Sequence, residues 1–126
     1  MRARALIAMA LGLFAAVALA APAVAGGGAK TKVTIEAESG GFFGFVDSSN
    51  VDKCANGRKV TLFKQLGDSQ DPHSDQKIGS DIAQANGDGY MWSTGNTGSH
   101  GGRFYARAGK TKGCKADTSK TIKAQK

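Results

Sequence analysis

The chain has few of the residues, and none of the short motifs, that mark common enzyme and metal sites. Its 126 residues include two cysteines and two histidines. Neither cysteine has a second ligand at C-x-x-C or C-x-x-H spacing, which argues against a zinc pair. The G-x-S-x-G elbow of serine hydrolases, the Walker A phosphate loop and the H-E-x-x-H helix of zinc peptidases are all absent. We therefore expect no catalytic residue set, no cofactor and no metal site of these kinds.

Helical periodicity is also absent after residue 25, and so is any internal repeat. Short runs instead alternate between apolar and polar residues, and polar or glycine-rich segments separate these runs. About seven strands at spacings of roughly ten to fifteen residues predict an all-β fold, an antiparallel β-sandwich of two sheets. The sandwich is expected to be one domain, residues 33–126. Its expected strands span residues 33–38, 42–46, 58–64, 77–85, 90–92, 104–108 and 118–124.

Only the start of the chain is strongly apolar. Two arginines precede an alanine-rich run over residues 5–21, which ends at the small-residue site A-V-A. This pattern predicts a secretory signal peptide over residues 1–25 and a flexible, glycine-rich lead-in over residues 26–32. A retained membrane anchor is the alternative, whereas a lipoprotein is disfavoured because no cysteine lies near the cleavage site. The cleaved chain would have no transmembrane span and would be secreted, extracellular or held at the cell envelope.

Cys54 and Cys114 both lie in the exported part of the chain, where disulfides form readily, so we expect them to pair. The bond would close a loop of about sixty residues and add roughly 4 kcal/mol in the chain-entropy model. Two free thiols or a metal pair are the alternatives. Cys54 also opens the stretch C-A-N-G-R-K-V-T-L-F-K, in which Asn56-Gly57 predicts a turn and Val60 and Leu62 share the apolar face of a strand.

Aromatic residues make up only 7% of the chain, and most of them fall in expected strands. In the run F-F-G-F-V, residues 42–46, phenylalanines point to both faces, which predicts a strand covered on both sides. The segment N-G-D-G, residues 86–89, predicts a hairpin turn followed by a strand with Tyr90 and Trp92 on one face. We expect Trp92 to pack in the core.

Acidic residues are nearly missing from the last quarter of the chain. Residues 26–102 have a net charge of −2, whereas residues 103–126 have eight Lys or Arg against Asp117 alone, a net charge of +7. Such a patch could attract an anionic envelope polymer, an acidic lipid or nucleic acid. Alternatively, its lysines could form a solvated sheet edge that resists pairing with other chains.

Arg103, Tyr105 and Arg107 share one face of an expected strand in this basic quarter. A basic, aromatic strip of this kind can stack on sugar rings and pair with phosphate or carboxylate. No RNP-like or helix-turn-helix pattern is present, so nucleic-acid binding would not depend on base sequence, and we rank it below an envelope polymer or lipid. The candidate binding residues are Arg103, Tyr105, Arg107, Lys110, Lys112 and Lys115.

Two further constellations stay open as alternatives. His73 and His100 each lie in a polar loop, and with loop carboxylates they would form a hydrolytic site if the fold brought them together. Five aspartates offer the hard oxygen ligands that calcium prefers, but their spacing does not match an EF-hand loop. These aspartates could instead cap turns or offset the basic tail. They are Asp68, Asp71, Asp75, Asp81 and Asp88.

The order of these features resembles that of prealbumin-like domains. A glycine-containing strand, the cysteine with its turn and strand, a loop and the hairpin A-N-G-D-G-Y-M-W follow one another as in the carboxypeptidase regulatory-like and transthyretin-like families, from about Phe42 to Ala108. The hydroxyisourate hydrolases of this superfamily have a Y-R-G-S signature. The closest stretch here reads Y-A-R-A, so none of their catalytic roles carries over.

The chain is also similar to small exported proteins of high-GC, actinobacterial-type bacteria that share a C-x-N-G-R-K-V-T-x-F-K stretch and a G-C-K-A-D-T-S-K ending. These resemblances imply a prealbumin-like (transthyretin-like) sandwich and a secreted location, but no activity. From the charge pattern we expect a non-catalytic binding or structural module at the cell envelope, which meets an anionic surface through its basic C-terminal quarter. The alternative is a small secreted hydrolase with a loop-built His/Asp site.

Overall fold

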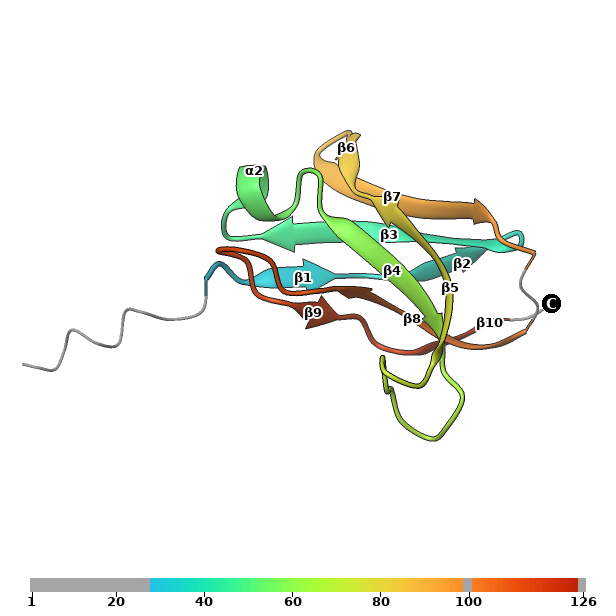
Figure 1. The fold of residues 1–126 in the computed structure, drawn as a ribbon. Helices are drawn as coiled ribbons and strands as arrows, with labels where there is room; N and C mark the ends of the chain where they lie inside the picture. Colours follow the sequence, from blue (N-terminus) through green and yellow to red (C-terminus); the bar gives the residue numbers. More distant parts are fainter. Residues whose placement is uncertain (1–27, 99–100, 125–126) are drawn as a thin grey trace, which may run out of the picture.

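The computed structural model describes residues 28–98 and 101–124, and it confirms the all-β sandwich. In this part of the chain, ten strands form two five-stranded antiparallel sheets, with one helical turn beside them (Figure 1). The expected signal peptide, residues 1–25, and the first two residues of the lead-in lie outside the described residues.

The first sheet, named sheet I, has β3 and β7 at its centre. Along one side β1 and β2 both pair with β3, and along the other side β6 pairs with β7. The strands of sheet I are β1 (Thr31–Val33), β2 (Glu36–Glu38), β3 (Gly41–Ser48), β6 (Gln84–Asn86) and β7 (Gly89–Asn96).

The second sheet, named sheet II, has β4 and β8 at its centre. β5 pairs with β4 on one side, and β9 and β10 both pair with β8 on the other. The orders β1-β3-β7-β6 and β10-β8-β4 follow the ABED and GFC orders of immunoglobulin-type sandwiches, and sheet II adds β5 beside β4. The strands of sheet II are β4 (Lys59–Lys64), β5 (Gln76–Ile82), β8 (Gly102–Ala108), β9 (Asp117–Thr118) and β10 (Ile122–Ala124).

Trp92 explains why the expected strand 33–38 is divided into β1 and β2. Its indole is fully buried between the sheets, as predicted, and Nε1 donates a hydrogen bond of 3.0 Å to the Thr34 carbonyl. The regular ladder is interrupted there, and Ile35 packs into the core. A Cβ on Gly44 would come within 2.0 Å of the Thr34 carbonyl oxygen and 2.8 Å of the indole Nε1, so this hydrogen bond depends on a glycine at position 44.

Two other expected strands are also divided. The run 77–85 becomes β5 and β6, because the chain passes from sheet II to sheet I at the fully buried Ala83. The run 118–124 becomes β9 and β10, because Ser119 turns inward and its hydroxyl accepts a hydrogen bond of 2.9 Å from the Ala106 N–H. Both breaks depend on contacts with the opposite sheet or with a neighbouring strand. The alternation of residues within a run carries no information about such contacts.

The core lies between the two sheets, and one prediction about it is wrong. The rings of Phe42 and Phe104, on facing sheets, lie 4.6 Å apart between centroids. On the other face of β3, however, Phe43 is half-buried and Phe45 is 38% exposed, so this strand is covered on one side only. A two-layer sandwich buries one face of each sheet, and apolar residues on both faces of a run do not change that.

The expected disulfide is present. Cys54, at the end of the helical turn α2 (Val51–Cys54), is bonded to Cys114 in the loop after β8, with 5.5 Å between their Cα atoms. The two predicted turns are also confirmed, since Gly57 and Gly87 adopt positive φ angles of 77° and 63°. The four residues of α2 are too few to produce a helical period, so the sequence pattern missed this turn.

Arg58 organises the end of the sandwich that holds the disulfide, which we call the disulfide end. Its side chain is buried, with a relative exposure of 4%. Its guanidinium donates hydrogen bonds to four oxygens from three segments, and burial lowers the pKa of the group. The acceptors are the carbonyls of Cys54 (2.9 Å), Gly109 (2.8 Å) and Lys115 (2.8 Å), and the hydroxyl of Thr31 (3.1 Å).

Candidate functional site

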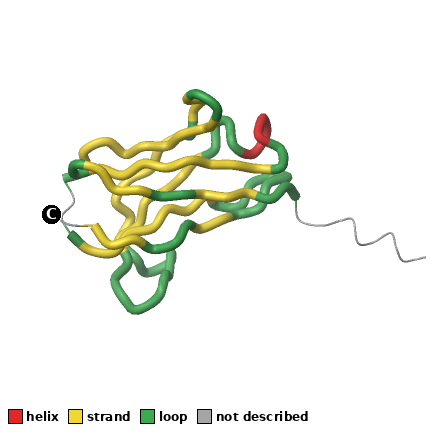
Figure 2. Tube along the Cα trace, turned by 180° about the vertical axis from the view of Figure 1, so that it is seen from behind, coloured by secondary structure: helices red, strands yellow, loops and turns green. Residues whose placement is uncertain are grey.

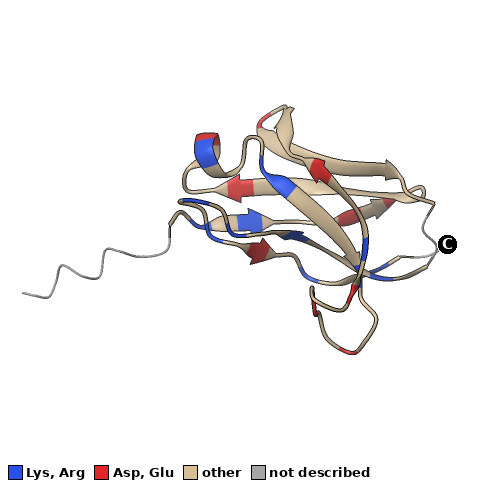
Figure 3. Cartoon of the chain, viewed as in Figure 1, with Lys and Arg blue, Asp and Glu red and all other residues tan. Residues whose placement is uncertain are grey.

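The structure divides the predicted basic set between two ends of the molecule. Arg103 and Arg107 lie on the outward side of β8, as the alternation predicts. Phe104 and Ala106, which lie between them in the strand, are fully buried on the core side. Lys110, Lys112 and Lys115 instead lie exposed in the loop that follows β8 at the disulfide end. Figure 3 shows Lys and Arg residues at both ends of the sandwich.

The prediction that Tyr105 belongs to an accessible aromatic strip is wrong. Tyr105 is fully buried, although it shares the outward side of β8 with Arg103 and Arg107. Its ring stacks on Phe63 of β4, with centroids 5.2 Å apart and an interplanar angle of 14°. The segment 65–75, between β4 and β5, covers both rings. Tyr105 therefore stabilises the fold and cannot stack on a ligand.

Asp75 fastens this covering segment, which we call the Asp75 loop (residues 65–75). Its carboxylate accepts hydrogen bonds from the Tyr105 hydroxyl at 2.5 Å and from the N–H groups of Leu66 at 2.9 Å and Asp71 at 2.7 Å. The hydroxyl of Tyr105, together with the Leu66 N–H, holds the pKa of Asp75 below its ordinary value, and burial raises the pKa of Tyr105. Figure 2 shows this loop projecting from the sandwich.

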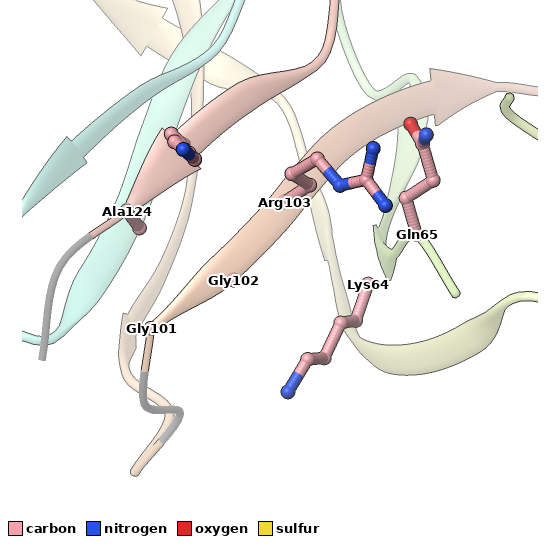
Figure 4. Close-up of a pocket in the computed structure, with 7 residues that line it drawn as sticks. Lys64, Gln65, Gly101, Gly102, Arg103 and Ala124 are labelled. Carbon is pink, nitrogen blue, oxygen red and sulfur yellow. The ribbon is translucent and has the colours of Figure 1, made fainter. Parts of the chain in front are cut away.

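Beside the Asp75 loop, three cationic residues line one hollow of about 580 Å³, which we call the notch. Lys64 ends β4, Arg103 lies near the start of β8, and Lys123 pairs with Arg103 from β10. Figure 4 shows Lys64 and Arg103 on neighbouring strands, with the arginine side chain directed toward Gln65. The full lining is Lys64, Gln65, Gly101, Gly102, Arg103, Lys123 and Ala124.

Contacts with β8 and with the Asp75 loop position two of these cations. The Lys64 ammonium lies 6.0 Å from the centroid of the Phe104 ring. Its chain crosses Gly102, where a Cβ would come within 2.9 Å of the lysine Cε. One terminal nitrogen of Arg103 donates a hydrogen bond of 2.9 Å to the Gly67 carbonyl, so the Asp75 loop holds the guanidinium at the rim of the notch.

None of the cations of the notch is neutralised by a carboxylate within the described residues. In these segments the one pair of opposite charges within 4.0 Å is His73 with Asp71, at 3.8 Å. Unpaired cations on adjacent strands attract phosphate or carboxylate groups, and Arg103 retains free N–H donors for such a group. The arrangement is therefore suited to holding an anion, with an affinity that falls as salt rises.

Sequence reasoning missed Lys64 and Lys123 because strand pairing, and not chain position, brings them to Arg103. Lys64 lies within residues 26–102, which have a net charge of −2, and its period-2 position would place it on the core face. It reaches solvent because β4 ends there. Lys123 belongs to the basic quarter, but alternation does not predict that its strand pairs with β8.

The alternative histidine and calcium sites receive no support from the described geometry. The side chain of His73 is fully exposed, and His100 lies outside the described residues. The aspartates make separate structural contacts: Asp75 fastens its loop, Asp71 accepts a hydrogen bond from the Ser74 hydroxyl in a turn, and Asp81 accepts a hydrogen bond of 2.8 Å from the Ser93 N–H. Residues 28–98 and 101–124 contain no group of three or more His, Cys, Asp or Glu placed to hold a metal ion.

In the part of the chain that the structure describes, no helix has the length and apolar character needed to cross a bilayer. Comparison of the chain with family models, with curated proteins and with solved structures finds no match to any of them.

Proposed function

We propose that the protein is a non-catalytic binding module of the extracellular space or cell envelope, and that it holds an anionic polymer at the notch. The observation that carries this proposal is the meeting of Lys64, Arg103 and Lys123, from three adjacent strands, around one hollow with no carboxylate partner among the described residues. Two of the three cations belong to the basic C-terminal quarter, so the proposal keeps that part of the sequence prediction and adds β4 to it.

Export is part of the proposal. The disulfide supports it, because such bonds persist in oxidising compartments, and so does the secretory pattern of residues 1–25. The relation to prealbumin-like domains is likewise proposed. Its support is the order of the cysteine, the turn at Gly57, β4 and the hairpin at Gly87 along the chain.

Binding to linear polyphosphate and to vesicles that contain phosphatidylglycerol tests the function of the notch. The double variant Lys64→Glu/Lys123→Glu should weaken polyphosphate binding about tenfold or more, because two attractive charges become repulsive. The matched control is Lys110→Glu/Lys112→Glu, which makes the same change of net charge at the disulfide end.

The two variants separate the notch from the other basic end. Two results together support the notch: affinity is lost only in the Lys64/Lys123 variant, and the affinity of the wild type declines as salt rises from about 50 to about 200 mM. Equal losses in both variants would mean that net charge alone attracts the polymer. A larger loss in the Lys110/Lys112 variant would move the site to the disulfide end, and unchanged binding in both would overturn the proposal.

A further inference from the structure

A second hollow, of about 210 Å³, opens at the same end of the sandwich as the notch. Its walls come from sheet I, where β2 ends, β3 begins and β7 ends. Antiparallel pairing places these strand ends together, since Gly41 pairs with Asn96 and Glu38 pairs with Gly41. The lining residues that the argument uses are Glu38, Gly41, Phe43, Ser93, Gly95 and Asn96.

The floor of this hollow is bare backbone, because β3 and β7 approach too closely there for side chains. A Cβ on Gly41 would lie 2.0 Å from the Gly95 carbonyl oxygen. The register of the two strands also shifts at this point, so that Thr94 is an extra residue between the partners of Phe42 and Phe43. Bulges of this kind commonly redirect side chains next to binding sites.

Beside Phe42, whose ring is buried in the core, the walls combine the aromatic ring of Phe43 with uncommitted polar groups. The ring of Phe43 is half-buried on the outer face of β3. Asn96 accepts a hydrogen bond of 2.9 Å from the Gly98 N–H through Oδ1, which leaves its amide N–H groups to donate. Ser93 Oγ accepts from the Gly95 N–H at 3.2 Å and keeps its own proton to donate, while the exposed Glu38 carboxylate can accept.

Charge separates the roles of the two hollows. The carboxylate of Glu38 repels an anionic group, so the second hollow suits a neutral, hydroxyl-bearing ring with an apolar face. The notch, with its three cations, suits an acidic substituent. The core connects the two hollows: the ring of Phe42, which lines the second hollow, lies 4.6 Å from that of Phe104 between centroids, and the Lys64 ammonium of the notch lies 6.0 Å from the Phe104 centroid.

We propose that the second hollow binds a sugar ring, with Phe43 against the ring face and Glu38 and Asn96 on its hydroxyls. On the proposed function of the notch, on which this inference rests, the anionic polymer is then an acidic polysaccharide. An acid group of the polymer occupies the notch, and a sugar ring elsewhere on the same polymer occupies the hollow. A phosphate-only polymer offers neither an apolar ring face for Phe43 nor hydroxyls for Glu38.

The test compares acidic polysaccharides with a sugar-free polyanion on the full secreted chain. Polygalacturonate, hyaluronate and linear polyphosphate are titrated at matched charge concentration. Phe43→Ala and Glu38→Ala should each weaken binding of at least one polysaccharide about fivefold to tenfold, and leave polyphosphate binding unchanged. The matched controls are Phe45→Ala, on the same face of β3, and Asp88→Ala, an exposed carboxylate in the turn before β7; both lie outside the hollow.

The outcomes distinguish this inference from the proposal for the notch. If Phe43→Ala and Glu38→Ala leave all three affinities unchanged, or weaken them no more than the controls do, the sugar site is overturned. In that case the notch would still be supported if the wild type binds polyphosphate and the Lys64/Lys123 variant does not. Glu38 is exposed, so its variant tests the hollow even if Phe43→Ala fails to fold, as thermal unfolding would reveal.

Discussion

The hydroxyl of Tyr105 donates a hydrogen bond of 2.5 Å to Asp75 Oδ2, and this pair fastens the Asp75 loop to the outer face of sheet II. The same loop holds the Arg103 guanidinium through the Gly67 carbonyl. The two residues therefore link the stability of the loop to the shape of the notch, although neither of them faces a ligand.

Removing the hydroxyl should loosen the loop more than the core. We expect Tyr105→Phe to lower the free energy of unfolding by about 1–2 kcal/mol, because the Asp75 carboxylate loses one of three donors in a largely buried site. Hydrogen exchange should become faster at Leu66 and Asp71, whose N–H groups share that carboxylate. Unchanged protection at both amides would show that the loop does not depend on Tyr105.

Acid should destabilise the protein through the same loop. A hydrogen bond from the Tyr105 hydroxyl, which has the larger effect, and one from the Leu66 N–H hold the pKa of Asp75 below its ordinary value of 3.8. Because the folded pKa is the lower one, this contribution to stability is present above pH 3.8 and is lost as the pH falls below it. In thermal unfolding from pH 6 to about pH 2, Asp75→Asn should show a weaker pH dependence than the wild type. An identical dependence would contradict this assignment.

The disulfide should matter most for the C-terminal quarter. Cys54 and Cys114 are 60 residues apart, and closing such a loop contributes roughly 4 kcal/mol in the chain-entropy model. In the double variant Cys54→Ser/Cys114→Ser, amides of residues 109–116 should therefore exchange first, before those of β4. In mass spectrometry, the non-reduced protein should be lighter than the reduced chain by about two daltons, because forming one disulfide removes two hydrogens. A non-reduced protein with the mass of the reduced chain would contradict the bond.

Arg58 should be intolerant of lysine. Its guanidinium reaches acceptors on both sides of its fork, and a single ammonium cannot reproduce that geometry in a buried site. We expect Arg58→Lys to cost about 2–4 kcal/mol in chemical denaturation. The neighbouring Lys59→Met, at an exposed position, is the control and should change stability by less than about 0.5 kcal/mol.

A charge-only change in the notch isolates the electrostatic part of binding. Lys64→Met keeps the aliphatic stem over Phe104 and removes the ammonium, so we expect unchanged thermal stability. The slope of log affinity for polyphosphate against log salt should become shallower by about one unit or less, since one fewer cation displaces counterions. A variant with the wild-type slope would place Lys64 outside the site.

The parts of the fold that depend on local alternation could be predicted from the sequence, and the parts that depend on pairing could not. The β4 strand, the turns at Gly57 and Gly87 and the burial of Trp92 all follow from residues within a few positions of one another. The break at Ala83 does not, because it reflects the passage between sheets.

The site shows the same division. Alternation correctly placed Arg103 and Arg107 on one side of β8, but it cannot tell an exposed side from a covered one. Tyr105 is buried by a loop whose anchor, Asp75, lies 30 residues earlier in the chain. Lys64 reaches the notch through the pairing of β4 with β8, a contact that no local pattern records.

The first and last described residues of the domain lie at opposite ends of the sandwich (Figure 1). Ala29 donates a backbone hydrogen bond of 2.9 Å to Gly113, beside the disulfide, whereas Ala124 pairs with Gly102 at the notch. A purification tag or fluorophore fused after the last strand would therefore crowd the anion site, and one placed ahead of Gly28 would leave it clear. By the same geometry, protein immobilised through its N-terminal side would present both hollows to the solution, which is the orientation that surface-based binding measurements require.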